Sequence, residues 1–171
     1  MPDDRPSLAA DGMMLRNHWY VAAWSDEVGR DPVARVLLGD MIVLYRREDG
    51  TPVALDNRCP HRNLPLSEGR LHGDDLECGY HGMVFGSDGQ CLHLPGSDTV
   101  PDWASMRSYP VLERQGWVLV WMGEAAAAND AAFPGLRAGY PRTGSLERRK
   151  CGEGAAGPAS LRVRALAQTS T

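Results

Sequence analysis

The stretches CPH (59–61) and CGYH (78–81) decide how this chain of 171 residues folds and what it can bind. Cys59 and His61 stand two positions apart, Cys78 and His81 stand three apart, and residues 62–77 separate the two stretches. Side chains two positions apart in an extended loop point the same way, and a tight turn brings together side chains that are three apart. We therefore predict two loop tips that each present one thiolate and one imidazole.

Two thiolates and two imidazoles are the ligand set of a Rieske-type 2Fe-2S cluster, in which Cys binds one iron and His the other. Each iron takes two protein ligands, so each loop would give its Cys to one iron and its His to the other. We expect Cys59, His61, Cys78 and His81 to be the metal ligands and to clamp the cluster between two hairpin loops. This pattern favours a one-electron carrier.

Zinc is the alternative for the same four residues, because two Cys and two His also satisfy a tetrahedral zinc ion. Zinc fingers usually present both cysteines before both histidines, whereas the two types alternate here. A zinc-binding module without redox activity therefore stays open.

Residues 17–123 resemble the N-terminal domain of Rieske non-haem iron oxygenases, in particular the group that contains the oxygenase components of vanillate O-demethylases. The matching stretches are NHWYVAAWSDEV (17–28), LGDMIVLYR (38–46), CPHRNLPLSEG (59–69), ECGYHGMVFGSDGQC (77–91), LPG (94–96) and SYPVLERQGWVLVWMG (108–123). Asn63 departs from the pattern, since the family often has Gly there. The departure concerns the detail of the loop and leaves the ligands unaffected.

The resemblance implies an all-β fold, a Rieske-type antiparallel sandwich or barrel, and a role as the electron-input domain of an aromatic-ring oxygenase or O-demethylase. It also implies a donor, either an NAD(P)H-dependent reductase or a ferredoxin, and an oxygenase catalytic domain as the acceptor. A homotrimer is implied for a full-length form. A stand-alone Rieske ferredoxin remains the alternative, although such carriers are usually shorter and do not begin with WYVAAW (19–24).

Strand signals run along the chain and agree with an all-β fold. Runs rich in Val, Leu, Ile and aromatic residues predict strands: 19–24, 34–38, 41–46, 52–57, 83–86, 90–94, 109–113 and 117–121. GD (39–40), EDGT (48–51) and SDG (87–89) are typical of turns between them. The stretch GRLHGDD (69–75) predicts a polar spacer loop, in which His72 is solvated and Asp74 and Asp75 serve only to solvate a turn.

The chain lacks the residues for a second iron site. A complete Rieske oxygenase binds mononuclear iron through two His and one carboxylate. The five His are 18, 61, 72, 81 and 93, and no Asp/Glu-x2-His-x4-His motif is present. Mononuclear non-haem iron is therefore expected only in a full-length form, and whether this chain is itself an enzyme stays undecided.

Composition and charge indicate a globular protein whose C-terminal tail differs in composition from the rest of the chain. Hydrophobic residues make up 43% and charged residues 23%, which is ordinary for a globular chain. Residues 1–16 form a leader with early acidic residues and no apolar run, so we expect no signal peptide. The run WVLVWM (117–122) is too short to span a bilayer, so we expect no membrane contact and a cytoplasmic location.

Residues 124–171 are expected to be a linker and a disordered tail, at the point where the family's catalytic domain would begin. Between 137 and 171 the chain has seven Lys or Arg, two Glu and no sustained apolar periodicity, which suggests a truncated or frameshifted reading frame. The basic residues are scattered and Tyr140 is the single aromatic among them, so we expect no nucleic-acid partner.

Overall fold

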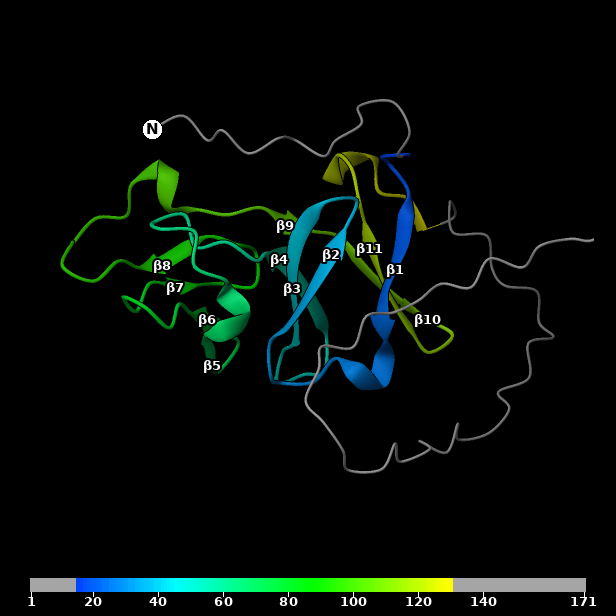
Figure 1. Cartoon of the computed structure of the whole chain (residues 1–171), viewed down its shortest axis with the longest axis horizontal. Coiled ribbons are helices and arrows are strands. Elements are labelled where there is room, and N and C mark those ends of the chain that lie inside the picture. Colours follow the sequence, from blue (N-terminus) through cyan, green and yellow to red (C-terminus); the bar gives the residue numbers. More distant parts are fainter. Residues whose placement is uncertain (1–14, 131–171) are drawn as a thin grey trace, which may run out of the picture. The chain divides into compact units, whose positions relative to one another are not determined.

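The computed structural model describes residues 15–130 (Figure 1). This part of the chain is all-β, with eleven strands and four short 3-10 helices. The strands are β1 (Trp19–Trp24), β2 (Val33–Leu37), β3 (Asp40–Arg46), β4 (Pro52–Asp56), β5 (Arg70–His72), β6 (Asp75–Glu77), β7 (Val84–Phe85), β8 (Cys91–His93), β9 (Ser108–Tyr109), β10 (Val111–Arg114) and β11 (Trp117–Trp121). The 3-10 helices are η1 (Ser25–Glu27), η2 (Leu66–Glu68), η3 (Asp102–Ala104) and η4 (Ala125–Ala127).

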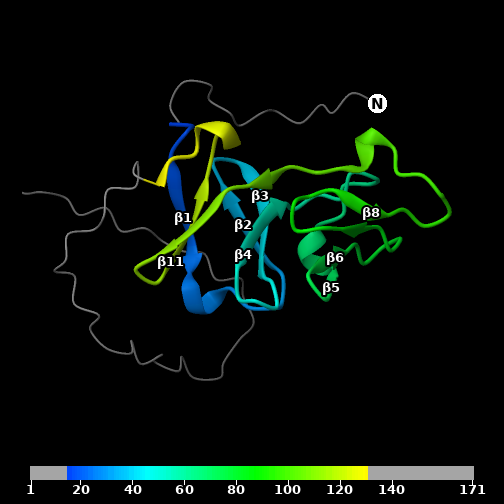
Figure 2. The same cartoon turned by 180° about the vertical axis from the view of Figure 1, so that it is seen from behind.

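The strands form three antiparallel sheets. Sheet A has the order β1-β11-β10, sheet B the order β2-β3-β4-β9, and sheet C the order β5-β6-β7-β8. Both views show sheet B between the other two, with sheet C at one end and sheet A at the other (Figures 1 and 2). The predicted all-β antiparallel fold is confirmed.

Strand β3 lies at the centre of the described fold, because both of its faces are buried. Ile42 and Leu44 face sheet A and pack with Val118 and Val120, while Val43 and Tyr45 on the opposite face join the core shared with sheet C. A strand covered on both sides needs a continuous apolar run instead of alternation. This accounts for the uninterrupted apolar run MIVLY (41–45) within β3.

The prediction of a polar spacer loop at 69–75 is wrong in part, because the chain forms a hairpin there. β5 and β6 pair with each other across Gly73 and Asp74, and β6 pairs on to β7. Each strand has only three residues and contributes one leucine to the interior, Leu71 or Leu76. Strands this short show almost no alternation of apolar and polar residues. Their structure is therefore decided by pairing with neighbouring strands.

The strand predicted over 109–113 is also divided. Tyr109 ends β9 in sheet B, and Val111 begins β10 in sheet A. Pro110 stands between them, and proline has no N–H to give to a ladder. The chain therefore changes sheets at this residue.

Candidate metal centre

The first candidate loop leaves β4 and returns at η2, and it is closed by two backbone hydrogen bonds around Cys59. The Cys59 N–H donates to the Leu64 carbonyl at 2.9 Å, and the Asn63 N–H donates to the Cys59 carbonyl at 2.8 Å. Asn63 has φ of 58°, in the left-handed region. Asparagine tolerates that region better than other residues with a Cβ, which explains how it can replace the family's usual glycine.

The second candidate loop repeats this pattern between β6 and β7. The Cys78 N–H donates to the Met83 carbonyl at 2.8 Å, and the Gly82 N–H donates to the Cys78 carbonyl at 3.1 Å. Gly82 has φ of 74° and so takes the place of the left-handed asparagine. Both loops thus place a Cys at the start of the same hydrogen-bonded turn, although the His follows at a different spacing.

The loops sort their side chains by type. Cys59 and Cys78 are each 2% exposed and belong to the core between sheets B and C. The rings of His61 and His81 are exposed, and their Nδ1 atoms lie 3.1 Å apart. The four predicted site residues are therefore brought together, with the thiols inward and the imidazoles outward.

Cys59 sits in an environment that opposes ionisation when nothing is bound. Burial and the neighbouring Cys78 raise the pKa of the Cys59 thiol to about 11, against the N–H groups of His61 and Arg62, which act in the opposite direction. Metal binding needs the thiolate, so it must displace this proton. The two N–H groups are donors that would stabilise the bound thiolate.

Donor chemistry and arrangement together fit a two-iron cluster. Within residues 15–130, no three His, Cys, Asp or Glu side chains converge as the ligands of a single metal ion. The candidates instead form a thiol pair, with Cys78 in contact with Cys59, and an imidazole pair. One pair for each iron is the Rieske ligand rule.

The buried side-chain amide of Asn57 supports the first loop, and it was not predicted from the sequence. Asn57 is 1% exposed, and its Oδ1 accepts the Ser67 N–H at 2.7 Å while its Nδ2 donates to the Ser67 hydroxyl at 3.1 Å. Its own N–H donates to the Met41 carbonyl. The residue thus joins β3, the start of the loop and η2. An Asn at the end of an apolar strand was the available signal.

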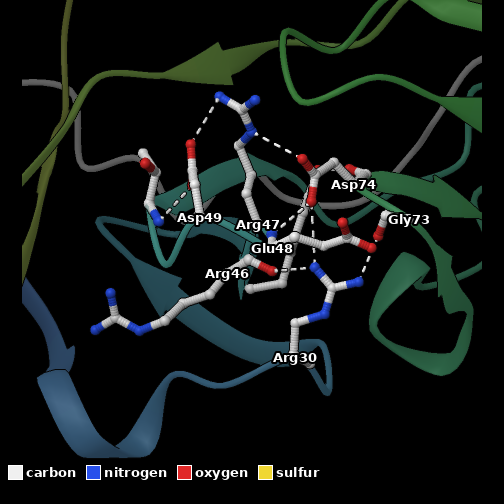
Figure 3. A network of polar contacts seen from close by, with 9 residues as sticks. Arg30, Arg46, Arg47, Glu48, Asp49, Gly73 and Asp74 are labelled. Carbon is white, nitrogen blue, oxygen red and sulfur yellow. Dashed lines mark hydrogen bonds and ion pairs between the residues drawn. The ribbon is translucent and has the colours of Figure 1, made fainter.

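Asp74 anchors the second loop to sheet B, which also corrects the expectation that it only solvates a turn. Its carboxylate accepts the Glu48 N–H at 2.6 Å and pairs with Arg30 and Arg47, each at 3.2 Å (Figure 3). The pKa of Asp74 is lowered, first by the Glu48 N–H and then by the arginine donors. The β5–β6 hairpin that leads to Cys78 is therefore fixed at its tip.

His72 is also more than a solvated loop residue. It lies on β5, where its Nε2 lies against the Glu77 carboxylate and 3.1 Å from the Arg70 Nε. Glu77 directly precedes Cys78, and its pKa is lowered chiefly by the Arg70 donor. These three side chains hold the two strands together next to the second loop.

Two further contacts shape the second loop. A Cβ at Gly79 would lie 2.9 Å from the Glu68 carbonyl, so glycine is needed there because η2 passes close by. The ring of Tyr80 lies beside that of His81, with centroids 3.7 Å apart. The imidazole is thus supported on one side by an exposed aromatic ring.

Comparison with known proteins shows the family of the chain. The family model of the Rieske [2Fe-2S] domain matches residues 18–110, more than half of the chain. The iron-sulfur subunit of the toluene-4-sulfonate monooxygenase system of Comamonas testosteroni is 46% identical over 118 residues, which cover 68% of this chain and 34% of the relative. The oxygenase component of dicamba O-demethylase from Stenotrophomonas maltophilia is 43% identical, covering 70% of this chain and 36% of the relative.

A solved structure gives the same result. The crystal structure of dicamba monooxygenase with non-heme iron and dicamba matches with a TM-score of 0.69 and 41% identity, covering 72% of this chain and 38% of that one. The chain thus spans about a third of the length of the curated relatives it matches. On these grounds the chain belongs to the Rieske [2Fe-2S] domain family, and its relatives are Rieske oxygenase components.

Proposed function

We propose that this chain carries one electron at a time as the electron-input domain of an aromatic-ring oxygenase or O-demethylase. Cys59 and Cys78 would bind one iron as thiolates, and His61 and His81 would bind the other through one ring nitrogen each. The observation that carries the proposal is the sorting of these side chains, with both sulfurs buried and the two Nδ1 atoms facing each other at 3.1 Å.

When bound, the cluster supplies a site that accepts and releases one electron, at a potential raised by its His ligands. The residues of the chain control access to it. The buried cysteines and Met83, whose sulfur lies 3.9 Å from that of Cys59, keep water from the inner side. The exposed His61 and His81 leave their second ring nitrogens to donate hydrogen bonds outward, where an electron acceptor can approach.

The donor would be an NAD(P)H-dependent reductase or a ferredoxin, and the acceptor an oxygenase catalytic domain. Identity above 40% to two oxygenase components supports this choice. The mononuclear iron would belong to that catalytic domain, because the motif for it is not found in this sequence. A homotrimer is proposed only for a full-length form.

The test is electron delivery. The reconstituted chain is reduced by NADH with a ferredoxin reductase, mixed with oxidised oxygenase component, and followed by stopped-flow visible absorption. We expect rapid reduction, lost in Cys59→Ser and unchanged in Cys91→Ser, and reoxidation that is fast only when the chain is joined to the catalytic domain and slow with the separate oxygenase component. A chain that contains iron and sulfide but is not reduced by any such donor would contradict the proposal.

A stand-alone Rieske ferredoxin is the second candidate, favoured by the missing iron-binding motif. The two candidate functions differ in whether the chain must be joined to its electron acceptor. A ferredoxin would turn over repeatedly between separate reductase and oxygenase molecules, whereas a domain would deliver electrons efficiently only when joined to its catalytic partner. A zinc-binding module would contain zinc without sulfide.

We propose that the functional unit is residues 17–123, with residues 1–16 as a leader. Of the predicted tail, 124–171, only residues 124–130 are among the described ones. A cytoplasmic location also stays a prediction. Among the described residues no helix is long and apolar enough to cross a bilayer.

A further inference from the structure

The two candidate loops are built against one shared element, the 3-10 helix η2. The first loop runs directly into it, since Leu64, whose carbonyl accepts the Cys59 N–H, is followed by Pro65 and then by η2. Leu66 of η2 is fully buried, in the same core as Cys59 and Cys78. Both cysteines therefore pack in one core with this helix.

The side chain of Asn57 fixes η2 to the start of the first loop. It accepts the Ser67 N–H at 2.7 Å and donates to the Ser67 hydroxyl at 3.1 Å. The backbone N–H of Asn57 donates to the carbonyl of Met41 on β3 at 2.9 Å. Asn57 is 1% exposed, so loss of any of these bonds leaves a buried polar group without a partner. The loop, β3 and η2 are therefore held as one unit.

The second loop meets the other end of η2, and a glycine stands at each contact. A Cβ at Gly79 would lie 2.9 Å from the Glu68 carbonyl oxygen. A Cβ at Gly69, which ends η2, would overlap the Glu77 carbonyl oxygen. Glu77 and Gly79 are the two neighbours of Cys78 in the chain. The backbone on both sides of the second cysteine is thus in close contact with η2 and its end.

The second loop is restrained from its far side as well. The hairpin of β5 and β6 that leads to it is tied to sheet B at its tip, where Asp74 binds the Glu48 N–H and pairs with Arg30 and Arg47 (Figure 3). The loop is therefore held between this anchor and η2. We call Asn57 together with residues 66–69 the bracket, because they join the two loops.

The bracket presents the four candidate ligands as two separate pairs. A sulfur and a nitrogen bound to the same zinc ion lie at most about 4.4 Å apart, since Zn–S is about 2.3 Å and Zn–N about 2.1 Å. In the described part of the chain, the thiols form one pair and the imidazoles another, and no three His, Cys, Asp or Glu side chains converge on one ion. This separation matches two irons and not one zinc ion.

We propose that the bracket makes this site selective for a two-iron cluster over a single zinc ion. Affinity alone would favour zinc, which binds a given set of nitrogen and sulfur ligands more tightly than ferrous iron does, so selectivity has to come from geometry. The bracket supplies that geometry by keeping the thiol pair and the imidazole pair too far apart for one ion to reach all four. This inference rests on the proposed function.

The test measures zinc binding by the 171-residue chain prepared without iron. Zn²⁺ is titrated in competition with a chromophoric chelator, and Co²⁺, which accepts the same ligands, reports the geometry through its visible bands. We expect the unaltered chain to bind Zn²⁺ weakly and to give no bands of a tetrahedral Co²⁺ site with two Cys and two His. Asn57→Ala should bind Zn²⁺ about tenfold more tightly, the scale on which outer contacts change metal affinity, and should give those bands. Equal affinity of the two chains would overturn the inference.

Two further variants separate loop spacing from general loss of stability. Ser67→Ala removes one of the two side-chain bonds to Asn57 and should bind Zn²⁺ with an intermediate affinity, so it decides the question if circular dichroism shows that Asn57→Ala is unfolded. Arg46→Lys disturbs the contact with Glu113, away from η2, and should keep the weak zinc affinity of the unaltered chain. A gain in Arg46→Lys as large as that in Asn57→Ala would contradict the inference.

The chain that carries the cluster gives a second readout. Each chain is reconstituted with iron and sulfide, exposed to equimolar Zn²⁺, and analysed for iron, acid-labile sulfide and zinc. We expect the unaltered chain to keep iron and sulfide, and Asn57→Ala to exchange them for zinc. If both chains keep the cluster equally well, the inference fails and the proposed function stands. If the unaltered chain forms no cluster at all, the proposed function fails and the inference fails with it.

Discussion

Asn63 and Gly82 occupy equivalent positions in the two candidate loops. Each donates its backbone N–H to the carbonyl of the Cys four residues earlier, at 2.8 Å and 3.1 Å, and each has a left-handed backbone, with φ of 58° and 74°. The two loops are therefore copies of one turn, built once with asparagine and once with glycine.

This relationship predicts the effect of substitutions at Asn63. Asn63→Val forces a β-branched residue into the left-handed region and should lower the free energy of unfolding by about 1–2 kcal/mol. Asn63→Gly should change it by less than about 1 kcal/mol, since glycine adopts that region freely. Thermal unfolding, with visible absorption to follow the cluster, measures both. Equal stability of the two variants would show that the backbone conformation of Asn63 is not constrained.

The amide of Asn57 should matter more than the hydroxyl it contacts. Asn57→Ala removes both side-chain bonds to Ser67 and leaves the Ser67 N–H without its acceptor, so we expect a loss of about 1–3 kcal/mol in the free energy of unfolding. Ser67→Ala removes only one of those bonds and is the matched control. Urea unfolding of both variants decides; an equal or larger loss in Ser67→Ala would contradict the assignment.

Arg46 is predicted to be a strong structural contributor outside the metal site. Its guanidinium binds both carboxylate oxygens of Glu113, at 2.9 and 3.0 Å, and also donates to the carbonyls of Ser25, Val28 and Gly50. Lysine cannot reproduce this fork. Arg46→Lys should therefore cost about 1–3 kcal/mol in urea unfolding. Arg58→Lys, whose guanidinium lies 3.9 Å from Asp56, should cost much less, and similar losses would refute the distinction.

The Asp74 anchor predicts a dependence of stability on pH. The pKa of Asp74 is lowered in the folded protein by the Glu48 N–H and by Arg47 and Arg30. A lowered folded-state pKa means that the stabilisation is complete above the ordinary carboxyl value of about 3.9 and is lost as pH falls below it. Asp74→Asn should thus lose stability near neutral pH and show a smaller further loss in acid.

Asp31→Asn, which changes an exposed carboxyl before β2, is the control for net charge. Unfolding is measured between neutral pH and pH of about 3, below the ordinary carboxyl value. If Asp74→Asn follows the same curve as the unaltered chain, the anchor contributes nothing to stability.

The redox prediction concerns His81. Replacing a His ligand by Cys makes the ligand set more like that of an all-Cys ferredoxin, whose potential is lower. His81→Cys should therefore lower the reduction potential in protein-film voltammetry, provided that the cluster is retained. His93→Cys, at an exposed position of β8, should leave it unchanged. An unchanged potential in His81→Cys with a retained cluster would exclude His81 as a ligand.

Much of the fold could be predicted because its signals are local. The runs that became β1, β3 and β11 are long and apolar, and the positions of Cys59, His61, Cys78 and His81 follow from two short motifs. The β5–β6 hairpin could not be predicted, since its strands have three residues each and depend on pairing with β7. The contacts of Asp74 could not be predicted either, because its partners Arg30, Arg47 and Glu48 are distant in sequence.

The central claim is the mixed Cys/His ligation of an iron–sulfur cluster, and anaerobic purification with EPR of the reduced chain tests it most directly. Iron and acid-labile sulfide are counted on the same sample. We expect equal amounts of iron and sulfide, in the ratio of a 2Fe-2S cluster, and an average g value below that of an all-Cys cluster. A colourless protein that contains zinc and no sulfide would contradict the account.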